Sequence, residues 1–203
     1  VPEAGVDVVS ASPERYLRRD GPHIRSSPIK GTGATAGDLT AKDVAENVMI
    51  VDLVRNDLGR VSRTGSVTVD DALAVEQHPG LVHLVSTVRG RLRDGYGWTG
   101  LLDATFPPGS VSGAPKSSAL RAIATLESRE RGPYCGAVGW VDADRAEGEL
   151  AVGIRTFWRE EGVLRFGTGA GITWGSDPDR EWRETELKAS RLLGLAATDG
   201  SET

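Results

Sequence analysis

The feature that most constrains the fold is the segment at residues 43–60. Its apolar positions 44, 48, 51, 54 and 58 share a stripe of helical period. Further apolar residues flank this stripe, so the segment is predicted to be a helix buried over most of its circumference. The same helix carries Asp43 and Glu46, three residues apart on one face. Because a buried carboxylate needs a partner or a cation, these acids are expected either to pair with arginines or to reach a metal ion.

The rest of the chain is predicted to be an α+β arrangement, in which helices flank antiparallel β-sheets. Residues 1–27 are extended and turn-rich, and strands are expected at 27–33, 66–69, 81–92, 134–141, 149–158 and 163–173. The last three are joined by short turns, which makes them antiparallel neighbours. Further helices are expected at 98–106 with Thr99 as cap, at 114–129, and from Ser176 or Asp177 to about 195. Asp38 or Thr40 is expected to cap the helix at 43–60.

The closing helix repeats the pattern of the first. Its buried stripe is expected to hold Trp182, Ala189, Leu192, Leu193 and Ala196. Four charged residues recur at spacings of three and four on another face, namely Glu181, Glu184, Lys188 and Arg191. From the pattern alone, this second face is a solvated surface with an internal ion pair between Glu184 and Lys188.

Composition and charge argue against several classes of function. The net charge is −5 with Lys and Arg dispersed along the chain, which argues against a nucleic-acid partner. The one cysteine, Cys135, allows no internal disulfide and fits a reducing compartment. No apolar run approaches the roughly 20 residues of a membrane span, so a cytoplasmic protein without a membrane partner is expected. The glycine-rich segments at 109–117 and 167–174 lack the spacing of phosphate-binding and dinucleotide-binding loops.

Nine short motifs follow one another along essentially the whole chain. They lie at residues 12–17, 28–32, 45–60, 83–87, 106–116, 134–139, 154–156, 169–172 and 184–188. Together and in this order they resemble the catalytic C-terminal half of the chorismate-utilising enzymes, a family that includes anthranilate, aminodeoxychorismate, isochorismate and salicylate synthases. The resemblance implies part of the α+β fold of anthranilate and aminodeoxychorismate synthase component I. It makes residues 1–197 an N-terminally truncated catalytic domain and 198–203 a frayed tail.

The resemblance also implies a Mg²⁺ ion between the first and last helices. Glu46 and Glu184 match the family's metal ligands, and the ion would bridge them to a carboxylate of chorismate. Asp43 and Glu181 lie one turn earlier on the same faces and are expected to hold metal-bound water. Mg²⁺ suits such a site because it takes few protein carboxylates and keeps several waters. The alternative for each acid is an ordinary surface ion pair.

Substrate carboxylates are expected to meet an arginine and a glycine-rich loop. Arg155, placed in a predicted strand, matches the family's carboxylate-binding arginine, and its planar fork suits that task. The loop at Gly169, Ala170 and Gly171 matches the one whose amides meet the other carboxylate. Ser112 is expected just before a helix N-terminus, which favours an anion, and Lys188 would add charge nearby.

Three further residues are expected around the substrate ring. His83 matches a histidine near the C4 hydroxyl leaving group, which it would protonate or orient. Tyr134 matches a tyrosine that hydrogen-bonds the substrate, with core packing as its alternative. Thr32 is expected to hydrogen-bond the substrate or its neighbours.

Lys30 distinguishes the reactions within the family. Aminodeoxychorismate synthases carry Pro-Ile-Lys-Gly-Thr, as at residues 28–32 here, whereas anthranilate synthases typically have Ala at the Lys position. The resemblance implies that Lys30 attacks C2 of the chorismate ring as the C4 hydroxyl leaves, and that ammonia then adds at C4 and expels the lysine. The attacking amine must be neutral, which requires a lowered pKa. The expected product is 4-amino-4-deoxychorismate, on the route to p-aminobenzoate and folate.

The sequence leaves two alternatives to this reaction, an anthranilate synthase and an inactive fragment. An anthranilate synthase would also release pyruvate, whereas an inactive fragment would only bind a partner. A domain of 203 residues is itself expected to be poorly stable or inactive without the rest of the family fold. Ammonia is expected from a glutamine amidotransferase subunit or fused domain, because no cysteine elbow with a downstream His-Glu pair is present and Cys135 falls in a predicted strand.

Overall fold

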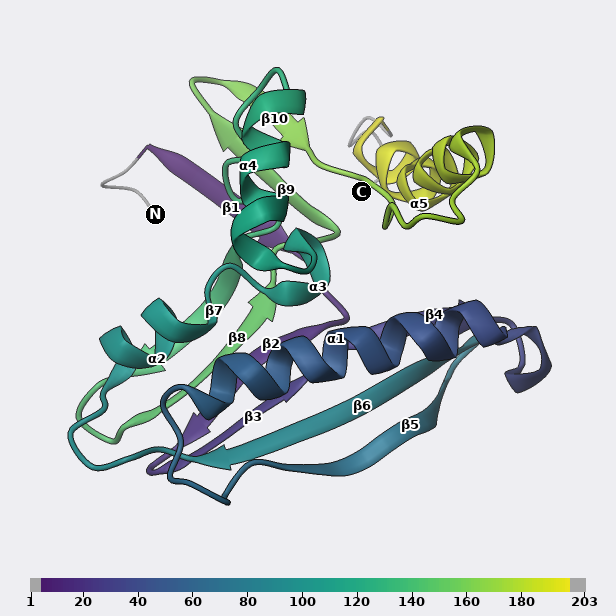
Figure 1. The fold of residues 1–203 in the computed structure, drawn as a ribbon. Helices are drawn as coiled ribbons and strands as arrows, with labels where there is room; N and C mark the ends of the chain where they lie inside the picture. The colour runs from purple at the N-terminus through teal and green to yellow at the C-terminus, as the bar shows by residue number, and fades with distance from the viewer. Residues whose placement is uncertain (1–4, 198–203) are drawn as a thin grey trace.

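The computed structural model describes residues 5–197, which form an α+β fold with two antiparallel sheets (Figure 1). The larger sheet has seven strands, with the order β4-β6-β3-β2-β8-β7 and β5 paired to the other edge of β6. Its strands are β2 (Arg15–Asp20), β3 (His23–Ser27), β4 (Ile29–Gly33), β5 (Thr68–His78), β6 (Leu81–Arg91), β7 (Ala137–Asp142) and β8 (Glu147–Val152). The predicted fold class is confirmed. The expected frayed tail at 198–203 lies outside the described residues.

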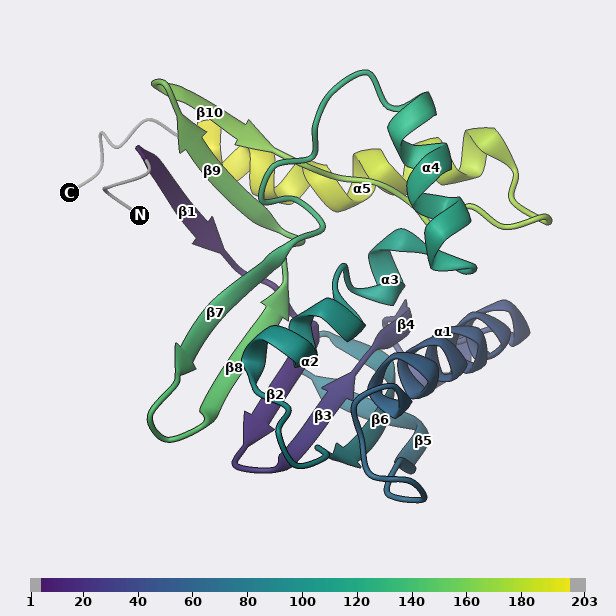
Figure 2. The same cartoon turned by 60° about the vertical axis from the view of Figure 1, so that its left-hand side comes forward.

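The smaller sheet consists of three strands in the order β1-β9-β10 (Figure 2). They are β1 (Val6–Ser10), β9 (Thr156–Glu160) and β10 (Val163–Phe166). The single strand predicted at 149–158 was therefore wrong, because β8 and β9 belong to different sheets. The chain bends between them at Gly153, where an added Cβ would lie 2.2 Å from the Pro133 carbonyl oxygen. The strand predicted at 163–173 ends at Phe166, and the glycine-rich segment after it is irregular.

Helices join and cover these sheets. They are η2 (Ala36–Asp38), α1 (Ala41–Gly59), α2 (Trp98–Thr105), α3 (Gly109–Ser112), α4 (Lys116–Leu126) and α5 (Pro178–Ala197). The cap of α2 is Gly97 rather than Thr99, and α4 begins after Pro115. The short helix α3 was not predicted, and Ser112 is its last residue rather than a residue just before α4. None of the helices within residues 5–197 is long and apolar enough to cross a membrane.

α1 lies across the larger sheet, against β6 and β4 (Figure 1). Thr40 caps it, since its hydroxyl accepts from the Asp43 N–H while the Asp43 carboxylate accepts from the Thr40 N–H. Its buried face holds Asn47, Ile50, Val54, Asp57 and Leu58. The prediction of burial around most of the circumference was wrong, because Val44, Val48 and Met49 are 39–48% exposed.

A network of hydrogen bonds explains why the buried face of α1 differs from the predicted apolar stripe. The Asn47 side chain donates to the Leu84 carbonyl oxygen at 3.1 Å and accepts from the Ser86 hydroxyl at 2.6 Å. A fully bonded amide can be buried without a large penalty, so position 47 takes the place that the pattern gave to 44 and 48. The pattern of apolar residues along the chain does not reveal that Asn47 has hydrogen-bond partners in β6.

α5 packs against the rest of the described chain through few side chains. Glu181 and Ala189 are its buried residues, whereas Trp182 and Leu193 are 66% and 47% exposed. Of the predicted buried stripe, Ala189 is buried and Leu192 is half-buried, and the prediction was wrong at Trp182, Leu193 and Ala196. α4 likewise has no buried residue. Figure 1 shows α5 standing above the N-terminal half of α1, away from the larger sheet.

Candidate active site

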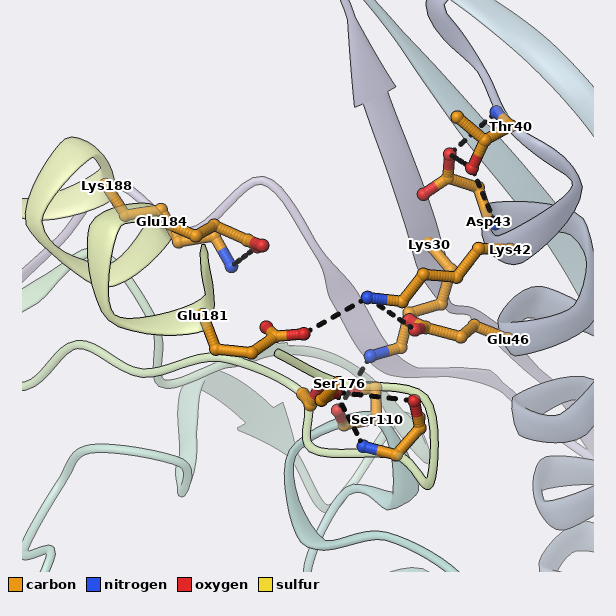
Figure 3. A network of polar contacts seen from close by, with 12 residues as sticks. Lys30, Thr40, Lys42, Asp43, Glu46, Ser110, Ser176, Glu181, Glu184 and Lys188 are labelled. Atoms are coloured by element: carbon orange, nitrogen blue, oxygen red, sulfur yellow. Dashed lines mark hydrogen bonds and ion pairs between the residues drawn. The ribbon is translucent and has the colours of Figure 1, made fainter. Parts of the chain in front are cut away.

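The candidate site lies where β4, the first turns of α1, the start of α3 and the first turns of α5 come together (Figure 3). These segments are far apart in the sequence. β4 supplies Lys30, α1 supplies Lys42 and Glu46, and α5 supplies Glu181 and Glu184. Glu46 and Glu181 face each other near Lys30, whereas Glu184 points toward Lys188 on its own helix (Figure 3).

A lysine that the sequence analysis did not single out links two of the acids. The Lys42 Nζ lies 3.7 Å from a carboxylate oxygen of Glu46 and 3.2 Å from a carboxylate oxygen of Glu181. Hydrogen bonding to Ser176 and the Lys42 ammonium lower the pKa of Glu181, although its burial opposes this. Both acids are largely shielded, with side chains 17% and 9% exposed. Glu46 and Glu181 thus share one cation across the gap between the helices.

The other two predicted acids have partners of their own. Glu184 pairs with Lys188 at 2.6 Å on the same helix, and both side chains are about half exposed. The Asp43 carboxylate receives the Thr40 backbone N–H and hydroxyl in the capping box. Within residues 5–197, no three His, Cys, Asp or Glu side chains lie close enough together to hold a metal ion. Of the two predicted ligands, Glu46 faces Glu181 rather than Glu184, and the shielded carboxylates of Glu46 and Glu181 are donors of the kind that Mg²⁺ takes.

Lys30 lies at the floor of the site. Its Nζ donates to the Ser110 carbonyl oxygen at 3.4 Å. A Cβ added at Gly171 would lie 3.7 Å from the same nitrogen, so the glycine-rich loop passes directly beside it. The structure therefore places the predicted nucleophile next to the predicted carboxylate-binding loop.

A buried carboxyl that the sequence analysis left without a role, Glu14, sits behind Lys30. It is 6% exposed, and burial raises its pKa, although the Ser110 side chain, the Lys30 ammonium and the Ile29 N–H lower it. Glu14 and Ser110 also line a cavity between β2, α1 and α3. A carboxyl with a raised pKa beside an amine is suited to exchange protons with it. The motif at 12–17 contained this residue, but a glutamate next to Ser-Pro carries no sign of burial.

His83 and Thr32 form a bonded pair on neighbouring strands. The Thr32 hydroxyl lies 2.8 Å from His83 Nδ1, and His83 is 4% exposed. Burial, then the positive fields of His78 and Arg155, lower the pKa of His83. The imidazole is therefore neutral at neutral pH, which suits orienting a hydroxyl better than protonating it.

Arg155 lies in the bend between β8 and β9 rather than in a strand. Its backbone has a φ of 49°, a left-handed conformation that non-glycine residues rarely adopt. The Arg155 carbonyl oxygen accepts from the Ala11 N–H at 3.1 Å, which helps to hold this bend. The side chain is exposed and close enough to His83 to lower its pKa. A strained residue that presents a guanidinium beside the site is consistent with a ligand-binding role.

Tyr134 packs on the glycine-rich loop. A Cβ at Gly167 would lie 2.2 Å from the Tyr134 ring, and one at Gly169 would lie 2.7 Å from the phenol oxygen. The glycines are thus required by the close approach of the tyrosine. The Lys188 ammonium donates to the Gly169 carbonyl oxygen at 3.4 Å, which ties α5 to this loop. Ala170 is half-buried in the same loop.

Ser112 does not face Lys30. Its hydroxyl donates to the Pro108 carbonyl oxygen at 3.0 Å and closes the turn of α3. Ser110, two residues earlier, supplies both the carbonyl oxygen that meets Lys30 and the side chain beside Glu14. The sequence analysis missed this residue because α3 itself was not predicted.

Comparisons with known proteins identify the family to which the chain belongs. The sequence profile of the chorismate binding enzyme family matches residues 1–194. Anthranilate synthase component 1 of Haloarcula marismortui is 44% identical over 201 residues, and aminodeoxychorismate synthase component 1 of Salmonella typhimurium is 40% identical over 198. These alignments cover 93% and 92% of this chain but 41% and 43% of the relatives. The chain therefore spans about two fifths of their length.

Solved structures show the same fold. Anthranilate synthase component I of Streptococcus pneumoniae superimposes with a TM-score of 0.81 at 36% identity, covering 93% of this chain and 44% of that one. The menaquinone-specific isochorismate synthase of Escherichia coli gives a TM-score of 0.81 at 27% identity, covering 94% and 46%. Enzymes with different named products thus share this architecture.

Proposed function

We propose a reaction for this chain from one established premise, which is that it belongs to the family of chorismate-utilising enzymes. The proposed reaction is the Mg²⁺-dependent amination of chorismate at C4 to give 4-amino-4-deoxychorismate. One observation carries the choice. A lysine at position 30 lies beside the glycine-rich loop and in front of the buried carboxyl of Glu14.

The chemistry begins with the neutral amine of Lys30. As its nitrogen bonds C2 of the ring, the two conjugated ring double bonds shift and the C4–oxygen bond breaks, which releases hydroxide. Glu14 is the proposed acceptor of the proton that the amine loses, because burial raises its pKa. Ammonia then bonds C4 and the bond from Lys30 to C2 breaks, while Glu14 returns its proton to the departing lysine nitrogen. The proton that the added ammonia loses converts the released hydroxide into water. The sum is chorismate plus ammonia giving aminodeoxychorismate plus water.

His83 and Thr32 are proposed to control the departing hydroxyl. If the Thr32 hydroxyl donates to Nδ1, the proton of the neutral imidazole resides on Nε2, the nitrogen that is proposed to meet the C4 oxygen. Arg155 and the amides at 169–171 are proposed to bind the two substrate carboxylates. Tyr134 is proposed to fix the loop and Lys188 to hold it to α5, whereas Ser112, whose hydroxyl closes the turn of α3, is given no substrate contact.

Glu46 and Glu184 would hold Mg²⁺, with Asp43 and Glu181 toward its waters, and the ion would offset the charge of a substrate carboxylate. Binding by Glu184 requires its release from Lys188, because Glu181 is the acid that faces Glu46 in this structure. Ammonia is proposed to come from a glutamine amidotransferase subunit or domain. A glutaminase nucleophile is not evident among the described residues, because Cys135 is buried and burial raises the pKa of its thiol.

A second candidate reaction is anthranilate synthesis with release of pyruvate. It is favoured by the names of several relatives, including anthranilate synthase component 1 of Haloarcula marismortui at 44% identity. The two reactions share the site and differ in whether the enolpyruvyl group is eliminated. Lys30 is the residue that favours the first.

Product analysis tests the proposal. The full-length protein is incubated with chorismate, Mg²⁺ and ammonium, and products are identified by mass. The expected result is aminodeoxychorismate with the enolpyruvyl group retained, and its loss in Lys30→Ala by about a thousandfold or more, as for removal of a covalent nucleophile. Release of pyruvate with anthranilate would instead establish the second reaction.

A further inference from the structure

Lys42 occupies the space between the two acidic faces of the site. Its ammonium meets Glu46 on its own helix at 3.7 Å and Glu181 on α5 at 3.2 Å (Figure 3). The field of Glu184 also acts on it, and the hydrogen bond to Glu181 is the main cause of a raised pKa for Lys42. One monovalent cation is therefore shared by the two carboxylates that face each other across the helices, and the cluster keeps a net charge of −1.

A divalent cation between these acids would repel that ammonium. Two like charges a few ångströms apart oppose each other, and Mg²⁺ would satisfy the carboxylates more strongly than a single ammonium does. The Lys42 side chain is 53% exposed on a flexible four-carbon stem, so it has a path into solvent. Occupation by Lys42 and by a metal ion is thus mutually exclusive, and exchange between them needs no change in the backbone.

Lys42 also holds α5 in place. α5 buries only Glu181 and Ala189 of its described residues, so apolar packing contributes little to its docking. The Lys42–Glu181 pair joins α5 directly to α1, which is itself packed on the sheet. Hydrogen bonds at Thr185 and Lys188 tie α5 to the preceding loop. Without the pair, the N-terminal turns of α5 would lose their direct link to α1.

We propose that Lys42 is a place-holder cation, which occupies the metal position and keeps α5 docked until Mg²⁺ displaces it. This inference rests on the metal site of the proposed function. Lys42 is then a positioning residue that weakens Mg²⁺ binding, because each Mg²⁺ ion that binds must displace the Lys42 ammonium from Glu46 and Glu181. Removal of Lys42 should therefore strengthen Mg²⁺ binding while loosening α5 in the metal-free protein.

The test measures both effects in the full-length protein. Mg²⁺ alone is titrated calorimetrically into the wild type, Lys42→Met, Lys42→Arg and Arg55→Met, and amide exchange of α5 is followed with and without Mg²⁺. Arg55→Met is the matched control, since it removes one cation from an exposed pair with Asp52 about 20 Å further along the same helix. Glu46→Gln identifies the site to which the measured binding belongs.

Lys42→Met should bind Mg²⁺ about threefold more tightly, because an ion pair of this exposure is worth a fraction of a tenfold change in affinity. Its α5 should exchange faster without Mg²⁺ and regain protection with it. Lys42→Arg and Arg55→Met should behave as the wild type in both measurements. If the substitution merely damaged the site, the affinity of Lys42→Met for Mg²⁺ would fall rather than rise.

Unchanged or weaker Mg²⁺ binding by Lys42→Met, with normal binding by the wild type, overturns the place-holder role and leaves the metal site standing. Tighter binding without any change in the exchange of α5 overturns the docking role. An absence of Mg²⁺ binding by the wild type, or binding that Glu46→Gln does not weaken, overturns the metal site and this inference with it.

Discussion

The two helices that carry the acids of the site are held by different means. α1 buries five side chains against the sheet, and one of them, Asn47, is hydrogen-bonded on both sides. α5 buries two side chains and exposes Trp182 and Leu193. One half of the site is therefore built into the core, whereas the other half is held by polar contacts at its surface. Ligands that bind between the helices are expected to stabilise α5 far more than α1.

The largest loss of stability should follow from breaking the ion pair that anchors α1. The Lys116 Nζ lies 2.6 Å from the Asp57 carboxylate, and the two side chains are 17% and 9% exposed. Lys116→Met should lower the free energy of unfolding by about 3–5 kcal/mol, because a shielded carboxylate loses its counter-charge. Urea unfolding measures this. Arg55→Met breaks the exposed pair with Asp52 and is the control, which should change the free energy of unfolding by about 0.5 kcal/mol or less. Equal losses for Lys116→Met and Arg55→Met would contradict the claim that the shielded pair anchors α1.

A smaller loss is expected from the polar core residue of α1. Asn47→Ala leaves the Leu84 carbonyl oxygen and the Ser86 hydroxyl without a bonded partner, which should cost about 1–3 kcal/mol. Thermal unfolding checks this value. Asn56→Ala, at an exposed position of the same helix, is the control and should be nearly neutral. A neutral Asn47→Ala would mean that the network does not set the orientation of the helix.

These residues show what the sequence conveys and what it does not. The period of the apolar residues predicted α1, and the motifs predicted the family, because both are local in the chain. The pattern failed where a distant partner decides burial, as when β6 satisfies Asn47. It also failed where a close approach bends the chain, as at Gly153, which separates β8 from β9.

The candidate site was predicted in the same partial way. Lys30, Glu46 and the glycine-rich loop lie together as expected. Lys42, Glu14 and Ser110 were missed because their roles depend on neighbours from other elements. Position 42 pairs with residue 181, and position 14 lies behind residue 30, which no spacing along the chain reveals.

The pH dependence of stability should distinguish the buried part of the site, which includes Glu14, from the part on α5. An unfolded glutamate ionises near pH 4.5, whereas burial raises the pKa of Glu14, so the folded state holds that proton to higher pH. Between these values the folded state binds more protons, and stability falls as pH rises. Glu14→Gln should therefore gain stability relative to the wild type as the pH rises above 4.5, until the folded carboxyl is ionised as well. A constant difference in urea unfolding across this range would contradict the raised pKa.

The smallest effect is expected at α5. The pKa of Glu181 is lowered, so its pairing stabilises the protein above pH 4.5 and is lost as pH falls through the folded pKa. Glu181→Gln should cost about 1 kcal/mol or less at pH 7, since its partner Lys42 is 53% exposed, and this cost should shrink as the pH falls below 4.5. Amide exchange should increase in α5 and not in α1. Faster exchange in both helices would show that they are held alike.

The central claim is that Lys30 is a covalent nucleophile, and mass spectrometry of the quenched protein and of its digest tests this claim most directly. The full-length protein is incubated with chorismate and Mg²⁺ without ammonia or glutamine, quenched, and digested. The account predicts a mass gain of chorismate minus one water, located on Lys30, absent in Lys30→Ala and discharged by ammonium as aminodeoxychorismate. An adduct that persists in Lys30→Ala, or amination by the wild type with no adduct on Lys30, would contradict it.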